Sequence, residues 1–115
     1  MQLESLTLMD DIVQLKLIGR LDRMGTETIN DRFSFAATVR KGKYIVDLAD
    51  VSFLTSAGIR MLMMTAKAQL NRGGMLVLAA PQPLILQVIE ASGIDQLIEV
   101  AADIESAISR LKSAA

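Results

Sequence analysis

The sequence predicts one α/β domain, with a mixed, mostly parallel sheet of about five strands, an N-terminal hairpin and about four helices. Two alternating apolar segments near the N-terminus indicate the hairpin. Short apolar runs then alternate with longer stretches whose apolar residues recur at helical spacing, which is the pattern of a sheet covered by helices. With 115 residues, of which 51% are hydrophobic and 22% charged, the chain is long enough for one core. We therefore expect a single domain over residues 1–115.

The first half of the chain starts with residues 3–9 and 12–18, which alternate, and the turn residues Asp10 and Asp11 between them predict a β-hairpin. Residues 19–25 (GRLDRMG) have glycine at both ends and are interpreted as a loop. Residues 26–39 follow as a helix, because their apolar residues have helical spacing and Thr26 is a suitable N-cap.

The second half continues the alternation of strands and helices. Residues 44–48 (YIVDL) are predicted to form a central strand. The helix after them begins at a hydroxyl pair, and its predicted apolar face consists of Ile59, Leu62, Met63, Ala66 and Leu70. The remaining predicted elements are a strand at 75–79, a helix from Pro81 or Pro83 to a stop at Gly93, a strand at 97–100 and a helix at 103–111 capped by Asp103.

The composition excludes several classes of function. The formal net charge is -1 and no basic block occurs, so nucleic-acid binding lacks its usual electrostatic signature. The chain has neither cysteine nor histidine, and its carboxylates have no metal-site spacing, so we expect no metal, no cofactor and no enzymatic activity. No signal peptide and no apolar run of about 20 residues is present, so we expect a cytoplasmic protein that does not insert into a membrane.

The stretch FLTSAGIR, residues 53–60, contains the most informative candidate residues. Thr55 and Ser56 stand where a strand gives way to a helix, so either hydroxyl could cap the helix by accepting a hydrogen bond from a first-turn amide. A phosphate is also tolerated at this position, because free amides and the helix dipole favour negative charge. The small residues Ala57 and Gly58 behind the pair leave room for another protein to approach.

Two further candidates come from the predicted loop and from the methionines. Asp22 would lie near Ser56 if their strands are neighbours, since loops at one edge of a parallel sheet form a common surface; it could equally be an ordinary solvated aspartate. Most methionines fill cores, but Met61 and Met64 lie off the predicted apolar face. Together with Met24, they could form an exposed apolar patch that docks a partner.

A response-regulator receiver domain is an alternative of similar length. Asp10 and Asp11 could imitate its acidic pair and Asp50 its phosphate acceptor. The segment after Asp11 alternates like a strand, however, and PQPL follows the strand at 75–79 where a receiver has a loop that carries lysine. Both features argue against a receiver.

Three segments resemble the STAS domain, and more narrowly the stand-alone bacterial anti-sigma factor antagonists. They are GRLD (19–22), VDLADVSFLTSAGIR (46–60) and PQPLILQVIEASGIDQLIEV (81–100), so the resemblance extends over nearly the whole chain. The serine-containing segment after VDL is the most specific of the three. Thr55 stands where many members have aspartate, and Ala57 stands where many have a second serine or threonine.

The resemblance implies a switch based on protein–protein interaction. The unphosphorylated antagonist binds an anti-sigma factor that is also a serine kinase, and thereby frees a sigma factor. Phosphorylation, at Ser56 by motif position with Thr55 as second choice, abolishes binding, and a PPM-type phosphatase restores it. The alternative is an unphosphorylated STAS accessory subunit of a membrane transporter or another complex. We expect a monomer whose partner-binding residues are Asp22, Met24, Thr55, Ser56, Ala57, Gly58, Arg60, Met61 and Met64.

Overall fold

A computed structural model describes residues 1–114 and contains one five-stranded sheet. The strands are β1 (Gln2–Thr7), β2 (Ile12–Leu21), β3 (Lys43–Leu54), β4 (Met75–Ala79) and β5 (Val100–Ala101), and they lie in this order across the sheet. β1 is antiparallel to β2, whereas all the other neighbouring strands are parallel. The predicted fold class, including the opening hairpin, is confirmed.

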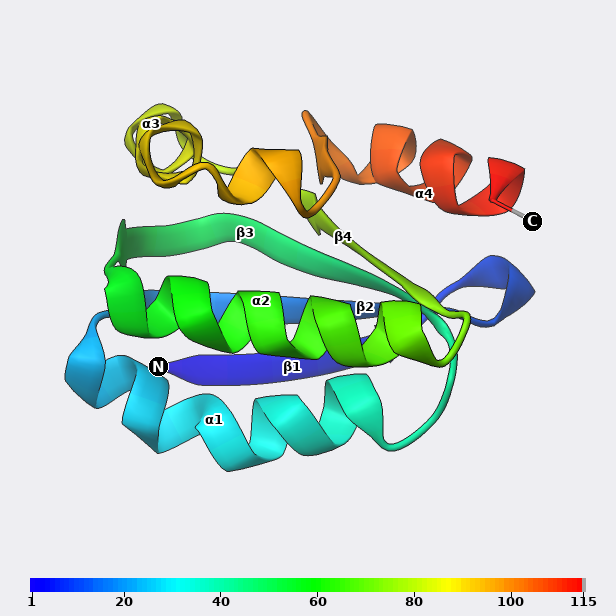
Figure 1. The fold of residues 1–115 in the computed structure, drawn as a ribbon, viewed down its shortest axis with the longest axis horizontal. Coiled ribbons are helices and arrows are strands. Elements are labelled where there is room, and N and C mark those ends of the chain that lie inside the picture. Colours follow the sequence, from blue (N-terminus) through cyan, green and yellow to red (C-terminus); the bar gives the residue numbers. More distant parts are fainter. Residues whose placement is uncertain (115) are drawn as a thin grey trace.

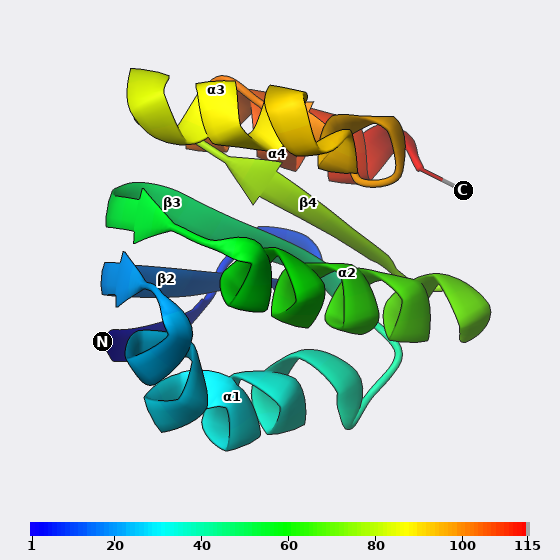
Figure 2. The ribbon, with the colours of Figure 1, turned by 60° about the vertical axis from the view of Figure 1, so that its left-hand side comes forward.

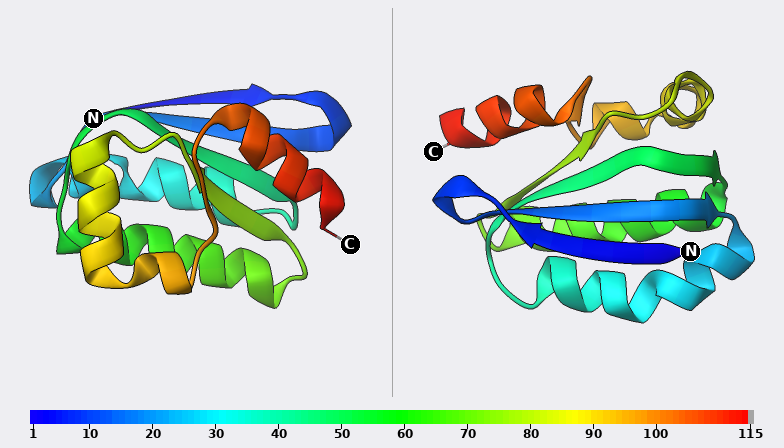
Figure 3. Two further views of the ribbon diagram at one scale, coloured as in Figure 1. Left: turned by 90° about the horizontal axis from the view of Figure 1, so that it is seen from above. Right: turned by 180° about the vertical axis from the view of Figure 1, so that it is seen from behind.

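Within residues 1–114, four α-helices cover the sheet. α1 (Arg23–Thr38) and α2 (Ser56–Asn71) lie side by side on one face, as Figure 1 shows. α3 (Pro83–Ser92) and α4 (Ile104–Ser113) lie beyond β3 and β4, well separated from α1 (Figure 2). α4 crosses the face opposite to α1 and α2 (Figure 3). There its buried Leu111 belongs to a small apolar core with Ile45 and Val77.

The main core lies between the sheet and the helices α1, α2 and α3. Leu15 of β2 and Leu48 of β3 meet Phe33, Leu62 and Ile89 from these helices, and all five are fully buried. Consecutive strand residues point to opposite faces of the sheet. Ile45, which stands between Tyr44 and Val46 of the main core, therefore joins the smaller core under α4. Burial of both sheet faces explains why β3 and β4 are rich in aliphatic residues.

The turn of the hairpin is made by the two acidic residues, as predicted. It contains a short 3₁₀ helix, Met9–Asp11, in which Asp10 and Asp11 have φ of 57° and 59°. Aspartate adopts this left-handed conformation more readily than most residues.

The predicted loop over residues 19–25 is wrong, whereas the central strand predicted over 44–48 is confirmed but is longer than predicted. β2 continues to Leu21 and β3 to Leu54, and the two strands stay paired in parallel to their ends. Each extended segment supplies the other with backbone hydrogen-bond partners, a long-range effect that local turn propensity does not register. α1 consequently begins at Arg23, so Thr26 lies inside the helix and is not its cap.

The buried face of α2 also differs from the predicted one. Thr65 and Gln69 are buried, whereas Leu70 is 68% exposed. The Gln69 amide donates to the carbonyls of Ala37 and Arg40 at 2.6 Å each and accepts from the Gly42 N–H at 3.0 Å. These bonds compensate the burial of a polar side chain, so the inward face is rotated relative to the purely apolar pattern.

The last third of the chain follows the prediction with one correction. α3 starts at Pro83 and ends at Gly93, which has φ of 78°, and Asp103 caps α4 by accepting from the Ser106 N–H at 2.7 Å. The strand predicted at 97–100 is reduced to Val100–Ala101, preceded by the 3₁₀ helix Ile94–Gln96.

Candidate functional site

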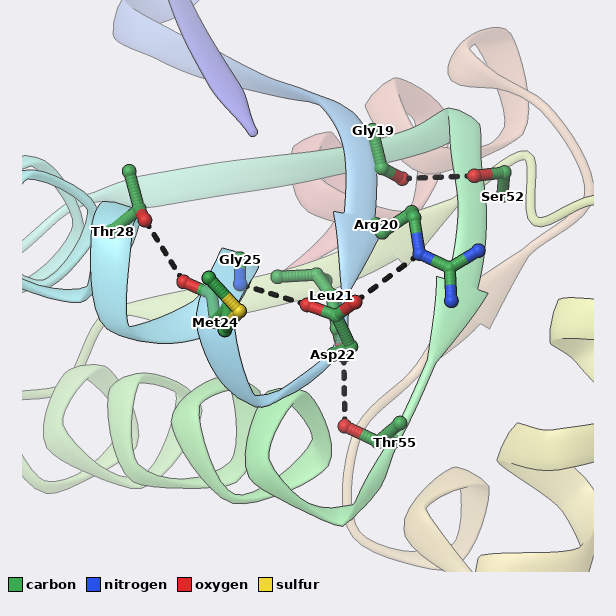
Figure 4. A network of polar contacts seen from close by, with 9 residues as sticks. All are labelled: Gly19, Arg20, Leu21, Asp22, Met24, Gly25, Thr28, Ser52 and Thr55. Carbon is green, nitrogen blue, oxygen red and sulfur yellow. Dashed lines mark hydrogen bonds and ion pairs between the residues drawn. The ribbon is translucent and has the colours of Figure 1, made fainter.

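The candidate site lies where β2 and β3 end and the chain enters α1 and α2. Leu21 and Leu54 are opposite each other in the final register position of these strands, so Asp22 and Thr55 follow them at the same edge of the sheet. The Thr55 N–H donates to the Leu21 carbonyl at 3.0 Å and ties the two strand ends together. The expectation that Asp22 and the hydroxyl pair come from neighbouring strands is confirmed (Figure 4).

Asp22 is the N-cap of α1 and is not a free loop residue. Its Oδ1 accepts from the Gly25 N–H at 2.8 Å, and its Oδ2 accepts from Arg20 Nε at 3.1 Å (Figure 4). These two bonds, the amide first, lower the pKa of the Asp22 carboxyl below its ordinary value. The carboxylate is therefore held in a defined position beside the start of α2.

Thr55 and Ser56 differ in their surroundings, although neither caps α2 through its side chain. Thr55 occupies the N-cap position without a side-chain capping bond, because its hydroxyl donates instead to the Leu21 carbonyl at 3.0 Å. It is half-buried. Ser56 is the first residue of α2 and is exposed, and its hydroxyl makes no hydrogen bond to any residue in the range 1–114. The interpretation of the pair as a hydroxyl cap is wrong.

Gly58 fixes how closely α2 approaches the strand ends. It is buried, and a Cβ built there would lie 2.9 Å from the Leu21 Cβ and 2.9 Å from the Leu54 Cδ1. Gly58 therefore faces the core, and its predicted place on an open surface is wrong. Its lack of a side chain lets α2 start directly over β2 and β3, while Ala57 remains half-exposed.

The methionines divide into exposed and buried residues. Met24 and Met64 are 77% and 65% exposed, as predicted, but Met61 is only 4% exposed. The rotated buried face of α2 brings Met61 into the core together with Leu62. An apolar docking patch at this site would contain Met24 and Met64 but not Met61.

Three arginine residues and one aromatic residue add to the surface. Arg60 is exposed and lines a shallow hollow between α1 and α2, together with Arg23 and Ala57. The Arg20 guanidinium lies 4.3 Å from the centroid of the Phe53 ring, which is 43% exposed. The sequence interpretation missed this cation–π pair. Phe53 could have been noticed, because its neighbour Leu54 must face the core and strand side chains alternate.

Within residues 1–114, no group of three or more acidic side chains could hold a metal ion. The described helices are also too short or too polar to cross a membrane. The site contains the accessible Ser56 hydroxyl, the first-turn amides of α2, the fixed Asp22 carboxylate, and exposed arginine and methionine side chains. Such a set is suited to binding a protein and to carrying a modification.

Comparison with known proteins gives one family. The family model described as "Mlab, STAS domain" matches residues 5–99. BtrV of Bordetella bronchiseptica, named as an anti-sigma factor antagonist, is 35% identical over 81 residues, which are 69% of this chain and 70% of BtrV.

Solved structures share the fold. An anti-sigma factor antagonist from Thermotoga maritima superposes with a TM-score of 0.84 at 20% identity, covering 96% of this chain and 94% of the other. A STAS domain protein from Planctomyces limnophilus gives 0.83 at 17% identity, covering 96% and 98%. The Bacillus protein SpoIIAA, in its phosphorylated form, gives 0.68 at 23% identity, covering 95% and 98%.

Proposed function

This chain belongs to the STAS domain family, and on that premise we propose that it is an anti-sigma factor antagonist controlled by phosphorylation of Ser56. In the unphosphorylated form, the monomer binds an anti-sigma factor that is also a serine kinase, and a sigma factor is released. The kinase then phosphorylates Ser56 and the complex dissociates. A PPM-type phosphatase returns the antagonist to its binding form. Because sigma factors act on RNA polymerase, this exchange takes place in the cytoplasm.

The observation that carries the proposal is the contrast between the two adjacent hydroxyls. Ser56 is exposed and has no hydrogen-bond partner among the described residues, whereas the Thr55 hydroxyl is bound to the Leu21 carbonyl. A kinase can reach Ser56 without breaking a native interaction. Phosphorylation of Thr55 would require the loss of one hydrogen bond and a local rearrangement. This difference favours Ser56 as the acceptor.

The position of Ser56 also explains how a phosphate could switch binding without unfolding the domain. The amides in the first turn of α2 have no side-chain cap, so they and the helix dipole favour an anion. At the same time the phosphate adds a charge of about -1.5 to -2 beside the fixed carboxylate of Asp22. A partner surface that fits a neutral hydroxyl would then face repulsion and desolvated charge.

The proposed docking surface consists of accessible residues at the two strand ends, at the start of α1 and on the first half of α2. Asp22 and Thr55 lie at the strand ends, Ala57 and Arg60 follow on α2, and Met24 and Met64 supply exposed apolar area. Methionine side chains adapt readily to a partner's shape. The chain itself performs no catalysis in this scheme, since ATP and its chemistry belong to the kinase.

The test is to map phosphorylation by mass spectrometry on the protein from its native cells, with and without stress. Phosphate on Ser56 that decreases when the sigma factor is released would support the proposal. Phosphate on Thr55 would keep the mechanism but move the site. A hydroxyl pair that stays unmodified in every condition would contradict the switch and favour the accessory subunit of a transporter or another complex.

Binding measurements with purified proteins complete the test. The partner to be purified is an anti-sigma factor kinase from the same organism, sought first among the neighbouring genes, and affinity is measured by calorimetry. We expect Ser56→Ala to bind the kinase and to resist phosphorylation, and Ser56→Glu to lose at least about tenfold in affinity. Equal affinities of both variants would show that charge at position 56 does not control binding.

A further inference from the structure

A groove separate from the Ser56 surface runs between the second half of α2 and the segment from α3 to β5. Its apolar lining includes Met63, Ala66 and Leu70 of α2, facing Leu97 and Ile98. Leu70 and Leu97 are 68% and 62% exposed, which is unusual for two large aliphatic side chains on opposite walls of one depression. The groove therefore exposes apolar surface that this domain does not cover itself.

The groove stays open because the edge of the sheet is incomplete there. β5 has two residues and pairs only with Leu78 and Ala79 of β4. Within residues 1–114 no strand lies beside the first part of β4, Met75–Val77, on that side. α2 and the chain between α3 and β5 line the groove on its two sides. Figure 2 shows α2 and α3 on either side of β4.

The charges on the two walls are unequal. Glu90 of α3 and Asp95 of the following 3₁₀ helix line one wall, and neither takes part in an ion pair with another residue in the range 1–114. Glu99 on the same wall is paired with Arg110 at 3.0 Å. On the opposite wall, Lys67 of α2 is the one basic side chain among the described residues that line the groove. A ligand in this groove meets apolar side chains at the centre and free carboxylates along one side.

We propose that the groove docks an amphipathic helix of a second protein, with an apolar stripe against α2 and lysine or arginine residues facing Glu90 and Asp95. The spacing of Met63, Ala66 and Leu70 places an apolar row about 10 Å long along the axis of α2, which suits helix-on-helix packing. The unpaired carboxylates determine the basic character of the partner's flank. Ser56 itself does not line the groove, and Met63 lies seven residues beyond it, about 10 Å along α2.

The experiment uses the full chain and two synthetic peptides of about 18 residues, or five helical turns. Both carry leucine at positions i, i+3, i+4 and i+7; the remaining flank positions are lysine in one peptide and glutamate in the other. Affinity is measured by fluorescence anisotropy, and the site is mapped from the chemical shifts of the isotopically labelled protein. We expect the lysine peptide to shift resonances of Met63, Leu70 and Leu97, and the glutamate peptide to bind about tenfold more weakly.

Matched variants distinguish binding in the groove from nonspecific hydrophobic binding. Leu70→Ser with Leu97→Ser should weaken binding of the lysine peptide by about tenfold or more. Leu84→Ser is the control, because Leu84 is 72% exposed on α3 but does not line the groove. Glu90→Lys with Asp95→Lys should also weaken binding, whereas Glu4→Lys on β1 should not.

Several results would overturn this inference. Equal binding of both peptides, an equal loss in Leu84→Ser, or shifts confined to the residues around Ser56 would each exclude a basic helix in the groove. A dimer of the unmodified protein that becomes monomeric in the Leu70→Ser, Leu97→Ser variant, measured by analytical ultracentrifugation, would show that a second copy fills it. None of these measurements depends on phosphorylation, so their outcome is independent of the proposed switch.

Discussion

Two single substitutions at the start of α2 separate the stability role of one hydroxyl from the proposed signalling role of the next. Thr55→Val keeps the shape of the side chain and its β-branch, and valine accepts the extended backbone of this residue, with φ of -114° and ψ of 177°. It removes only the bond from Thr55 Oγ1 to the Leu21 carbonyl, 3.0 Å long.

The expected loss of stability in Thr55→Val depends on which hydrogen bonds the Leu21 carbonyl keeps. The Leu21 carbonyl keeps its bond from the Thr55 N–H, so no buried group is left without a partner. The free energy of unfolding should fall by about 1 kcal/mol, the typical net value of one hydrogen bond. For a domain of this size, that lowers the melting temperature by roughly 3–6 °C. Ser56→Ala should change the free energy of unfolding by less than about 0.5 kcal/mol, because its exposed hydroxyl has no partner.

Both variants are measured by urea denaturation at neutral pH, and both are incubated with the kinase and ATP. Thr55→Val should lose stability and still be phosphorylated, whereas Ser56→Ala should keep its stability and not be phosphorylated. A loss of 1 kcal/mol or more in Ser56→Ala would refute this reasoning, because it would mean that Ser56 caps the helix after all. An unchanged stability of Thr55→Val would show that its bond to Leu21 contributes nothing.

Further predictions concern the groups that position the site. Gln69→Leu removes three hydrogen bonds to backbone groups, of which only the Arg40 carbonyl keeps another side-chain partner, the Tyr44 hydroxyl at 3.1 Å, and should cost about 3 kcal/mol in urea denaturation. Gln87→Leu, the same change at an exposed position, should cost almost nothing, and similar losses in both variants would contradict the network. Asp22 has a lowered pKa, so the charged form stabilises the fold above its ordinary pKa of 3.8, and this contribution disappears as the pH falls through the folded pKa. The stability advantage of the native protein over Asp22→Asn should therefore shrink below about pH 4, and a constant difference would refute it. Gly58→Ala should weaken kinase binding in calorimetry, since the new Cβ meets Leu21 at 2.9 Å and displaces the start of α2; unchanged affinity would show that the displacement does not reach Ser56.

Local patterns alone determined much of this protein. The alternation around Asp10 and Asp11 predicted the hairpin, because a turn and a period of two depend only on neighbouring residues. The end of α3 at Gly93 and the cap of α4 by Asp103 are predicted for the same reason. The segment from 53 to 60 identified the candidate site, since its residue types and their order carry the resemblance to the STAS domain.

Only the tertiary structure decided which groups face inward and which hydroxyl is free. β2 and β3 extend to Leu21 and Leu54 because each provides the other's backbone partners across more than 30 residues of sequence. That pairing places the Leu21 carbonyl within reach of Thr55 and leaves Ser56 exposed. Gln69 is buried by bonds to α1 and to the loop after it, which rotates α2 and carries Met61 into the core. These contacts join residues far apart in the chain, so no local pattern encodes them.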